Sequence, residues 1–366
     1  MSTDVMETAT DPIEALAGRL FAAGVEAMEL CNVYLGVQLG LYDALAGPPA
    51  TPAELAARTG LAPRYVREWL QQQAVAGLLE PDGSDPDTAR YALAAGVSSV
   101  LVDPTGPAYL GGLPSALAAV GHVLPDLVRA FRTGEAVPYA AYGPDAVSAQ
   151  SALNRPAYVN QLVADWLPRI PDLHARLADP TRPARVGDFG CGAGWSTIEL
   201  AKAFPHLRLD GYDSDEASIG AARRNAVEHG VADRVDFEVA DLSDDQADWS
   251  ARYDAVFLFE CLHDLPRPVE ALVNTRRALT PHATVIVMDE RTAAGFTAPG
   301  DPVERFFAAA STLWCVPQGM VGPDPEPVGP LMRASTLHDL ASRAGFRRSE
   351  VLDIEHPFWR FYRLVP

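Results

Sequence analysis

The chain has 366 residues, which is enough for about two domains with sizeable hydrophobic cores. Its formal net charge of −19 disfavours non-specific binding to nucleic acid and predicts no basic patch for a membrane surface. Its four cysteines form no C-x-x-C pair, and acidic residues such as Asp4 and Glu7 lie near the first residue. We therefore expect a cytoplasmic protein with reduced thiols and no signal or transit peptide.

The first predicted element is a long helix that begins at Asp11-Pro12 and runs toward Leu39. Residues 34–45 are apolar on most sides, so this surface must pack against another element. We expect that element to be a second copy of the chain, which predicts a homodimer formed through the N-terminal domain.

Residues 51–93 have the pattern of a winged helix-turn-helix. Thr51 and Glu54 form a capping-box signature for a helix that ends at Gly60, and a second helix spans 63–76. Two short apolar segments around a Pro-Asp-Gly-Ser turn then predict a β-wing. This unit either recognises DNA through Arg64 and Arg67 or serves for folding and dimerisation. The acidic chain favours the second interpretation.

Residues 101–175 are predicted to be helical and to link the two domains. Residues 104–125 contain no Asp, Glu, Lys or Arg, but several prolines and glycines interrupt them, so we expect a buried helix rather than a membrane span. Tyr139, Tyr142 and Tyr158 lie in or near loops, where they either anchor a core or cover a ligand site.

The most informative stretch is a βαβ unit between Arg185 and Asp213. Residues 186–189 form a short apolar strand, three glycines follow it with single-residue gaps, and a helix comes next. Such glycines allow a sharp turn and the close approach of a ligand. Asp213 ends the next strand about 20 residues later, where a carboxylate can accept hydrogen bonds from both hydroxyls of a ribose.

The spacing G-x-G-x-G differs from the dinucleotide fingerprint G-x-G-x-x-G, in which a pyrophosphate rests on the helix N-terminus. Asp188 lies two residues before the first glycine, and its charge would repel a pyrophosphate. A cationic nucleoside fits better. S-Adenosylmethionine (SAM) has a sulfonium, an α-ammonium and no phosphate. A nicotinamide oxidoreductase is therefore disfavoured, and an ordinary glycine-rich turn is the remaining alternative.

The rest of the chain predicts a parallel sheet with one insertion. Strands are expected at 235–239, 253–259 and 284–288, and the polar segment 260–264 follows the second of these, where open α/β sheets place their ligands. A Gly/Pro-rich insertion at 290–330 has the position and composition of a lid. A helix capped by Ser335 and a closing hairpin complete the chain.

Residues 185–289 resemble the class I SAM-dependent methyltransferases in every motif and in their order, and the segment from Val186 to Gly194 resembles motif I. With the winged helix, the whole chain resembles the bacterial winged-helix SAM-dependent methyltransferases, whose layout is similar to that of plant-type small-molecule O-methyltransferases. The resemblance implies an α/β, Rossmann-like core whose seven-stranded sheet has an antiparallel last strand. It implies a winged-helix dimerisation domain at 1–100, a helical linker at 101–175 and a SAM-binding domain at 176–366.

The same resemblance implies a cofactor site for SAM, with S-adenosylhomocysteine (SAH) as the product. We expect no metal. Asp241 would bind the adenine amino group, and the backbone of Leu242 would add a contact. The complete set of expected cofactor contacts is Asp188, Gly190, Gly192, Gly194, Asp213, Ser214, Asp241, Leu242, Phe259 and Glu260.

The segment Cys-Leu-His263-Asp264 resembles the Cys-His-Asp element whose histidine is the catalytic base in the plant-type enzymes. His263 is therefore the candidate base, and Glu290, or Asp289 beside it, would orient it. The family's second orienting glutamate would fall near 329–333, where this chain has Leu331, Met332 and Arg333. Alternatively, His263 caps the following helix or packs beneath the cofactor.

The predicted function is methyl transfer from SAM to a small molecule, most simply at oxygen. The alternatives are a SAM-responsive DNA-binding regulator and a SAM-binding enzyme that no longer methylates. The sequence does not identify the acceptor. Its expected contacts are apolar and aromatic, namely Tyr139, Tyr142, Tyr158, Phe306 and Trp314.

Overall fold

The computed structural model describes residues 11–244 and 248–366, so the prediction based on Asp4 and Glu7 lies outside the described residues. The chain divides into two compact units. The first contains the residues up to Asp103 and Ala108–Ala118, and the second contains Pro104–Pro107 and Ala119–Pro366. The expected three-part division, with breaks near residues 100 and 175, stays a prediction.

The first unit is the expected winged helix. The side chain of Asp11 accepts a hydrogen bond from the amide of Ile13 and caps α1, and Thr51 and Glu54 form the capping box of α3. The wing is an antiparallel pair of β1 and β2. The elements of this unit are α1 (Pro12–Gln38), α2 (Leu41–Leu45), α3 (Pro52–Thr59), α4 (Pro63–Val75), β1 (Leu79–Pro81), β2 (Tyr91–Leu93) and α5 (Val97–Leu101).

Helix α1 leaves a row of apolar side chains exposed. Its large exposed members are Ile13, Leu16, Leu20, Phe21, Val25, Met28 and Leu35. Within residues 11–244 and 248–366, α1 is the one helix whose length and composition would let it cross a membrane. The uncharged stretch 104–125 was expected to form a buried helix. It leads into α6 (Leu113–Thr133), which is only partly buried: Val123 and Leu127 are buried, whereas Val128 and Phe131 are exposed.

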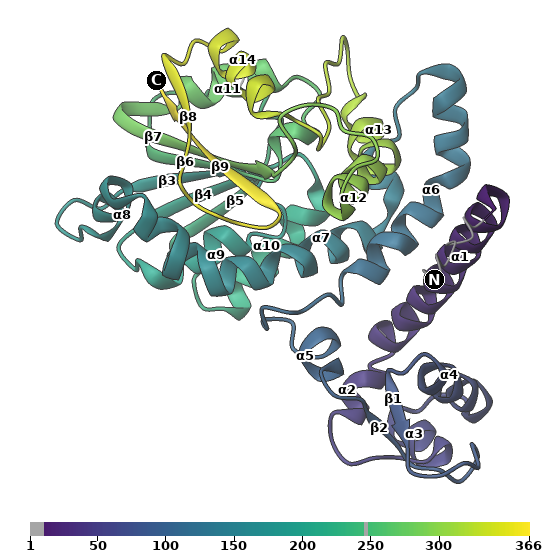
Figure 1. Ribbon diagram of the computed structural model, residues 1–366. Coiled ribbons are helices and arrows are strands. Elements are labelled where there is room, and N and C mark those ends of the chain that lie inside the picture. The colour runs from purple at the N-terminus through teal and green to yellow at the C-terminus, as the bar shows by residue number, and fades with distance from the viewer. Residues whose placement is uncertain (1–10, 245–247) are drawn as a thin grey trace, which may run out of the picture. The chain divides into compact units, whose positions relative to one another are not determined.

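The second unit is built on a seven-stranded sheet with the order β5-β4-β3-β6-β7-β9-β8 (Figure 1). Strand β9 runs antiparallel to both of its neighbours, and the other strand pairs are parallel. This confirms the expected Rossmann-like sheet. The strands are β3 (Arg185–Phe189), β4 (Arg208–Asp213), β5 (Val235–Val239), β6 (Tyr253–Phe259), β7 (Leu279–Glu290), β8 (Arg348–Val351) and β9 (Trp359–Val365).

Helices cover both faces of this sheet (Figure 1). Successive strand residues point to opposite faces, so β6 sends Phe257 into one apolar cluster and Leu258 into the other. The first cluster includes residues of α8 (Pro171–Ala178), α9 (Trp195–Ala203) and α10 (Glu216–Glu228). The second includes residues of α11 (Pro268–Arg277) and α14 (Ala334–Arg343). The N-cap residue of α14 is Arg333, and Ser335 lies inside the helix. The expected N-cap at Ser335 was therefore wrong.

Two further segments meet at the carboxyl edge of the sheet. One contains η1 (Tyr139–Tyr142), α7 (Pro144–Ala157), η2 (Tyr158–Trp166) and η3 (Leu167–Arg169). The other is the insertion after β7, which contains α12 (Pro302–Ala310), η5 (Ser311–Cys315) and α13 (Val316–Gly319). The two segments are joined by hydrogen bonds from the Val137 amide to the Pro317 carbonyl (3.0 Å) and from the Tyr142 hydroxyl to the Leu313 carbonyl (2.8 Å). The short helix η4 (Leu262–Asp264) follows β6 at the same edge.

Candidate active site

The glycine loop after β3 is held by backbone hydrogen bonds. The amides of Gly190 and Cys191 both donate to the carbonyl of Tyr212, at 2.7 and 3.0 Å. Gly190 has a φ of +77°, and a Cβ there would lie 2.4 Å from the Cβ of Cys261. Glycine is therefore required at this position by both backbone conformation and packing.

Asp213 lies at the end of β4 opposite this loop. Its Oδ2 accepts a hydrogen bond from the Gly192 amide and its Oδ1 accepts one from the Asp215 amide, both at 2.9 Å. Burial raises the pKa of Asp213 to about 6, although these two hydrogen bonds oppose the shift. Backbone groups thus fix the carboxylate before any ligand arrives, as a diol-binding group requires.

Asp188 does not reach the ligand cavity. It is buried on β3, and its Oδ2 accepts hydrogen bonds from the hydroxyls of Ser196 and Thr197, both at 2.5 Å. Burial raises its pKa. The structure therefore does not show the expected direct contact between Asp188 and a cationic ligand. The carboxylate instead binds two hydroxyls in the first turn of α9. Gly194 is also absent from the cavity wall and packs against Phe237.

The cavity at this edge has a volume of about 420 Å³, within the usual range for small-molecule sites. It brings together eight of the ten expected cofactor contacts: Gly190, Gly192, Asp213, Ser214, Asp241, Leu242, Phe259 and Glu260. The sequence analysis missed the side chains that α7 contributes, namely Val147, Gln150, Ser151 and Asn154, because nothing in their spacing marks them.

The cavity wall is acidic. Five carboxylates line it, and among the described residues of the wall there is no Lys, Arg or His. The five are Asp213, Asp215, Asp241, Glu260 and Asp264. A cavity with this charge favours a cation and disfavours an anion.

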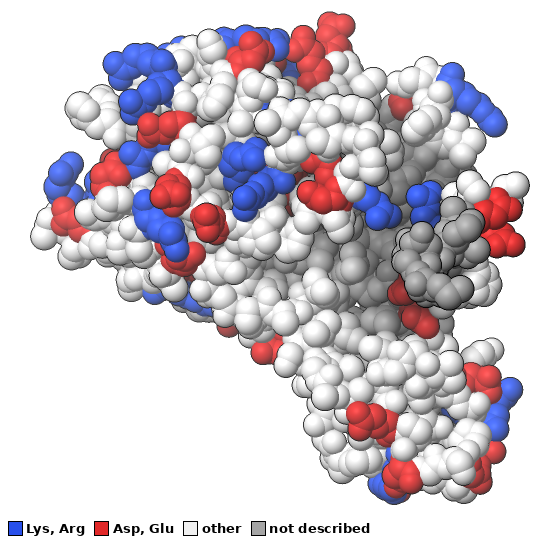
Figure 2. Space-filling view, in the orientation of Figure 1, with Lys and Arg blue, Asp and Glu red and all other residues white. Residues whose placement is uncertain are grey.

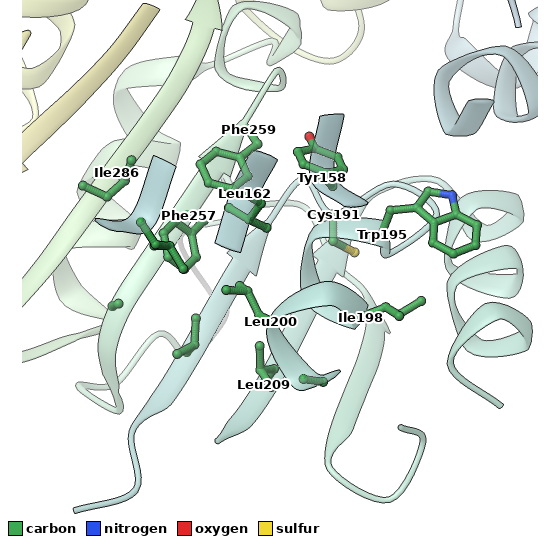
Figure 3. Packing of buried hydrophobic residues seen from close by; sticks show 14 of the residues in the cluster. Tyr158, Leu162, Cys191, Trp195, Ile198, Leu200, Leu209, Phe257, Phe259 and Ile286 are labelled. Atoms are coloured by element: carbon green, nitrogen blue, oxygen red, sulfur yellow. The ribbon is translucent and has the colours of Figure 1, made fainter. Parts of the chain in front are cut away.

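The aromatic residues expected to contact the acceptor divide into three groups. Tyr139 and Tyr158 line the cavity, and Tyr158 stacks on Phe259 with a centroid distance of 6.0 Å (Figure 3). Tyr142 and Trp314 pack against each other behind this wall, at 4.8 Å. Phe306 is half exposed and outside the cavity, so its expected role is not supported by its position.

His263, the candidate base, is buried and does not line the cavity. Its Nδ1 lies 2.9 Å from Asp289 Oδ1, and its Nε2 lies 3.2 Å from Asp264 Oδ1. Burial lowers the pKa of His263, but the two carboxylates outweigh burial and raise it well above its usual value. In this arrangement both imidazole nitrogens face carboxylates. Its assignment as the base stays a prediction that this geometry disfavours.

The carboxylate that orients His263 is Asp289 rather than Glu290. Asp289 Oδ1 also accepts a hydrogen bond from the Glu290 amide, at 2.9 Å. Two buried carboxylate oxygens near this histidine, Asp289 Oδ2 and Glu290 Oε2, accept no hydrogen bond within the described residues. Glu290 is buried at the end of β7, where burial and the charge of Glu260 raise its pKa.

Arg333, where the plant-type pattern would have its second glutamate, has a structural role. Its guanidinium forms a buried ion pair with Glu304 of α12 at 2.5 Å and donates to the Ala293 carbonyl at 2.9 Å. The donor atoms of His263, Asp264 and Cys315 lie within 4.8 Å of one another, which is the spacing of a metal site. Both imidazole nitrogens of His263 already face carboxylates. The contacts of His263 with acidic residues therefore explain why these three residues lie close together without a metal. The absence of a metal stays a prediction.

Comparison with known proteins agrees with this geometry. Residues 188–285 match the family model of a methyltransferase domain, and residues 27–102 match that of an Rv2258c-like winged HTH domain. The chain is 32% identical to the tetracenomycin polyketide synthesis 8-O-methyl transferase TcmO of Streptomyces glaucescens over 263 residues, which cover 69% of this chain and 72% of that protein.

A second relative is the 3-hydroxy-5-methyl-1-naphthoate 3-O-methyltransferase of Streptomyces sahachiroi, with 31% identity over 69% of this chain and 71% of that protein. The fold is shared with human N-acetylserotonin methyltransferase, whose structure is a complex with SAM. The TM-score is 0.67 at 18% identity, and the match covers 98% of this chain and 99% of the human chain. The chain therefore belongs to the SAM-dependent methyltransferases that carry an N-terminal winged-helix domain, and SAM is its methyl donor.

Proposed function

We propose that this methyltransferase acts on a hydroxyl group of a small aromatic molecule. The observation that carries the proposal is the cavity itself, in which Asp213, a carboxylate fixed by two backbone hydrogen bonds, shares one wall with Tyr139 and Tyr158. The two relatives described above are named as O-methyltransferases of a polyketide and a naphthoate, which supports the same class of acceptor.

The residues present fit SAM. The glycine loop leaves open space beside Gly192, where a Cβ would touch nothing within 4 Å. Asp213 would hold the ribose hydroxyls and Asp241 the adenine amino group. When bound, SAM supplies a methyl group and leaves as SAH. The chain contributes alignment of the acceptor oxygen, exclusion of water and removal of the acceptor proton. The acidic wall would also offset the positive charge of the sulfonium.

The test is a screen of the full-length protein with SAM and a panel of naphthols and hydroxynaphthoates. SAH and the methyl ether are measured by mass spectrometry, and Asp213→Ala serves as the binding-deficient control. Formation of one methyl ether in step with SAH supports the proposal. Methylation of amines alone, or SAM binding without any transfer across the panel, would contradict it.

DNA binding by the winged helix is not part of the proposed function. Both arginines of α4 are engaged by acids, because Arg64 pairs with Glu68 and Arg67 pairs with Asp87. Figure 2 shows acidic and basic side chains side by side on this unit rather than a continuous basic surface. Specific binding to duplex DNA at physiological salt would contradict this assignment and favour a regulator.

We also propose a homodimer in the cytoplasm, formed through the exposed apolar side chains of α1. Glu14, Arg19, Glu26 and Glu29 interrupt the helix and disfavour a membrane span. All four cysteines are free thiols, as expected in a reducing compartment. Light scattering on Phe21→Glu/Met28→Glu should show a monomer, whereas Glu14→Gln, the matched control, should stay dimeric. A monomeric wild type would reject the proposal.

A further inference from the structure

The two tyrosines of the cavity wall lie at different ends of it. Tyr158 stacks on Phe259 at the end of β6. Tyr139 lies at the β3–β4 end instead, where its hydroxyl interacts with the side chain of Ser218 and faces the carboxylate of Asp213. The sequence gives both tyrosines the same expected role, but their positions in the cavity indicate different ones.

The β3–β4 end of the cavity presents carboxylate acceptors to a ligand. Asp213 and Asp215 both line it, and Asp215 is itself held by a hydrogen bond from the Ser218 amide to its Oδ2 at 2.7 Å. A ribose hydroxyl can donate one hydrogen bond and also accept others. Carboxylates take up only the donors of the ribose, so its oxygens remain free to accept from a protein O–H. Among the side chains at this end, Tyr139 offers one.

The hydroxyl of Tyr139 keeps its proton in this environment. Burial raises its pKa above the usual value, and the charges of Asp213, Asp215 and Asp264 raise it further, whereas the hydrogen bond with Ser218 opposes the shift. The phenol is therefore a neutral O–H donor at physiological pH. Its ring adds an apolar surface that can cover the ligand.

The helix η1, which begins at Tyr139, is tied to the insertion after β7 on both sides. Before it, the Val137 amide donates to the Pro317 carbonyl at 3.0 Å. At its end, the Tyr142 hydroxyl donates to the Leu313 carbonyl at 2.8 Å. Movement of η1 away from the cavity would therefore break contacts with the insertion.

An aromatic contact reinforces this connection. The ring of Trp314, which belongs to the insertion, lies 4.8 Å from that of Tyr142 and 6.3 Å from that of Tyr139. Gln318, a few residues later, lines the same cavity. The β3–β4 end is thus connected to the insertion through Tyr139 and its neighbours.

We propose that Tyr139 binds the cofactor rather than the acceptor. Its hydroxyl donates to the ribose that Asp213 holds, its ring closes the adenosine end of the cavity, and the movement of η1 sets the rate of cofactor exchange. The inference rests on the proposed placement of the ribose at Asp213. It is independent of the acceptor class.

The first experiment measures affinity without an acceptor. Calorimetry on the full-length protein uses SAM, SAH and 5′-methylthioadenosine, which has the adenosine of SAM without its amino-acid part. Tyr139→Phe keeps the ring and should raise the Kd of all three ligands about 2–10-fold, because one hydrogen bond is lost. Tyr65→Phe, an exposed control on α4, should match wild type.

Two results of this experiment would overturn the proposal. One is an unchanged Kd for all three ligands in Tyr139→Phe. The other is a loss for SAM and SAH but not for 5′-methylthioadenosine, which would place Tyr139 beside the amino-acid part of the cofactor.

Asp213→Ala separates the role of Tyr139 from the placement on which it rests. Weaker binding in both Asp213→Ala and Tyr139→Phe supports both. Normal binding in Tyr139→Phe alone overturns the role of Tyr139 and leaves the ribose at Asp213. Normal binding in Asp213→Ala alone rejects the ribose placement, and with it the hydrogen bond proposed for Tyr139.

The second experiment measures cofactor exchange. Stopped-flow tryptophan fluorescence, with Trp195 on the cavity wall as a probe, gives the rates of SAM association and dissociation. Tyr142→Phe removes the hydrogen bond to Leu313 without changing a side chain of the wall. Both rates should rise together, while the Kd stays close to that of wild type. Tyr139→Ala should raise the dissociation rate and the Kd together.

A purely structural role would give a different result. In that case Tyr142→Phe would lower the free energy of unfolding, measured in denaturant, but leave both SAM rates as in wild type. Unchanged rates in this variant would therefore overturn the proposed control of cofactor exchange by η1.

Discussion

The β3–β4 end and the β6–β7 end of the cavity differ in the hydrogen-bond partners of their buried carboxylate oxygens. At the β3–β4 end, both oxygens of Asp213 accept backbone hydrogen bonds. At the β6–β7 end, two buried oxygens, Asp289 Oδ2 and Glu290 Oε2, accept none within the described residues. The carboxylates of Asp264 and Asp289 at the second end are instead held by their contacts with His263. The comparison indicates that backbone amides preorganise the first end, whereas side-chain ion pairs hold the second.

The largest expected effect tests whether the two ends depend on each other. In Gly190→Ala the new Cβ would collide with Cys261, which follows β6, and the residue would keep a φ of +77°. Overpacking and the left-handed conformation together should cost about 2–5 kcal/mol of unfolding free energy. In Gly192→Ala nothing lies within 4 Å, so only the conformational cost of about 1–2 kcal/mol remains. Denaturant unfolding compares the two, and equal losses would mean that the contact with Cys261 is not limiting.

The second expected effect is on SAM affinity and concerns the β3–β4 end of the cavity alone. Asp213→Ala should weaken SAM binding by about 1.5–3 kcal/mol, roughly tenfold to a hundredfold, because a charged hydrogen-bond acceptor is lost. Titration calorimetry measures it, with the exposed Asp236→Ala on β5 as the control that should bind normally. Unchanged affinity in Asp213→Ala would remove this carboxylate from the site.

A smaller effect follows from acidification. Burial raises the pKa of Asp213 to about 6 in the folded protein. Ionising this carboxylate therefore costs more free energy in the folded protein without ligand than in the unfolded chain. This group therefore lowers the stability of the free protein as pH rises from about 4 to 6. SAM requires the ionised carboxylate, so its Kd should rise about tenfold per pH unit below pH 6. Asp213→Asn should flatten this dependence in binding titrations from pH 5 to 8, and a dependence retained in that variant would assign it to another group.

The smallest effect concerns the insertion after β7, which we propose to be a lid. Gln318 and Val321 of this segment line the cavity, and the Glu304–Arg333 ion pair holds α12. Limited proteolysis in residues 291–301 should slow a few-fold when SAM and an acceptor are added. Glu304→Gln should speed cleavage of the free protein relative to Glu350→Gln on β8. Complete resistance of the free wild type would describe a fixed wall instead.

Local sequence patterns were sufficient to predict the sheet and the β3–β4 end of the cavity. The glycine loop and Asp213 lie within one βαβ unit, where strand, turn and helix constrain one another over a few residues. The capping box of α3 and the strand β6 are equally local, and the structure confirms both. The sequence thus determined the family and the methyl donor, and eight of its ten expected cofactor contacts lie on the cavity wall.

Only the tertiary structure decided which carboxylates face the ligand. Asp188 looked like a ligand contact but turns toward α9, and Asp289 rather than Glu290 orients His263. Phe306 lies outside the cavity, and Glu260 reaches it with one oxygen held by Trp359. The physical reason is that the direction of a side chain past a strand end depends on the backbone kink and on partners up to about a hundred residues away. No periodicity in the sequence encodes those partners.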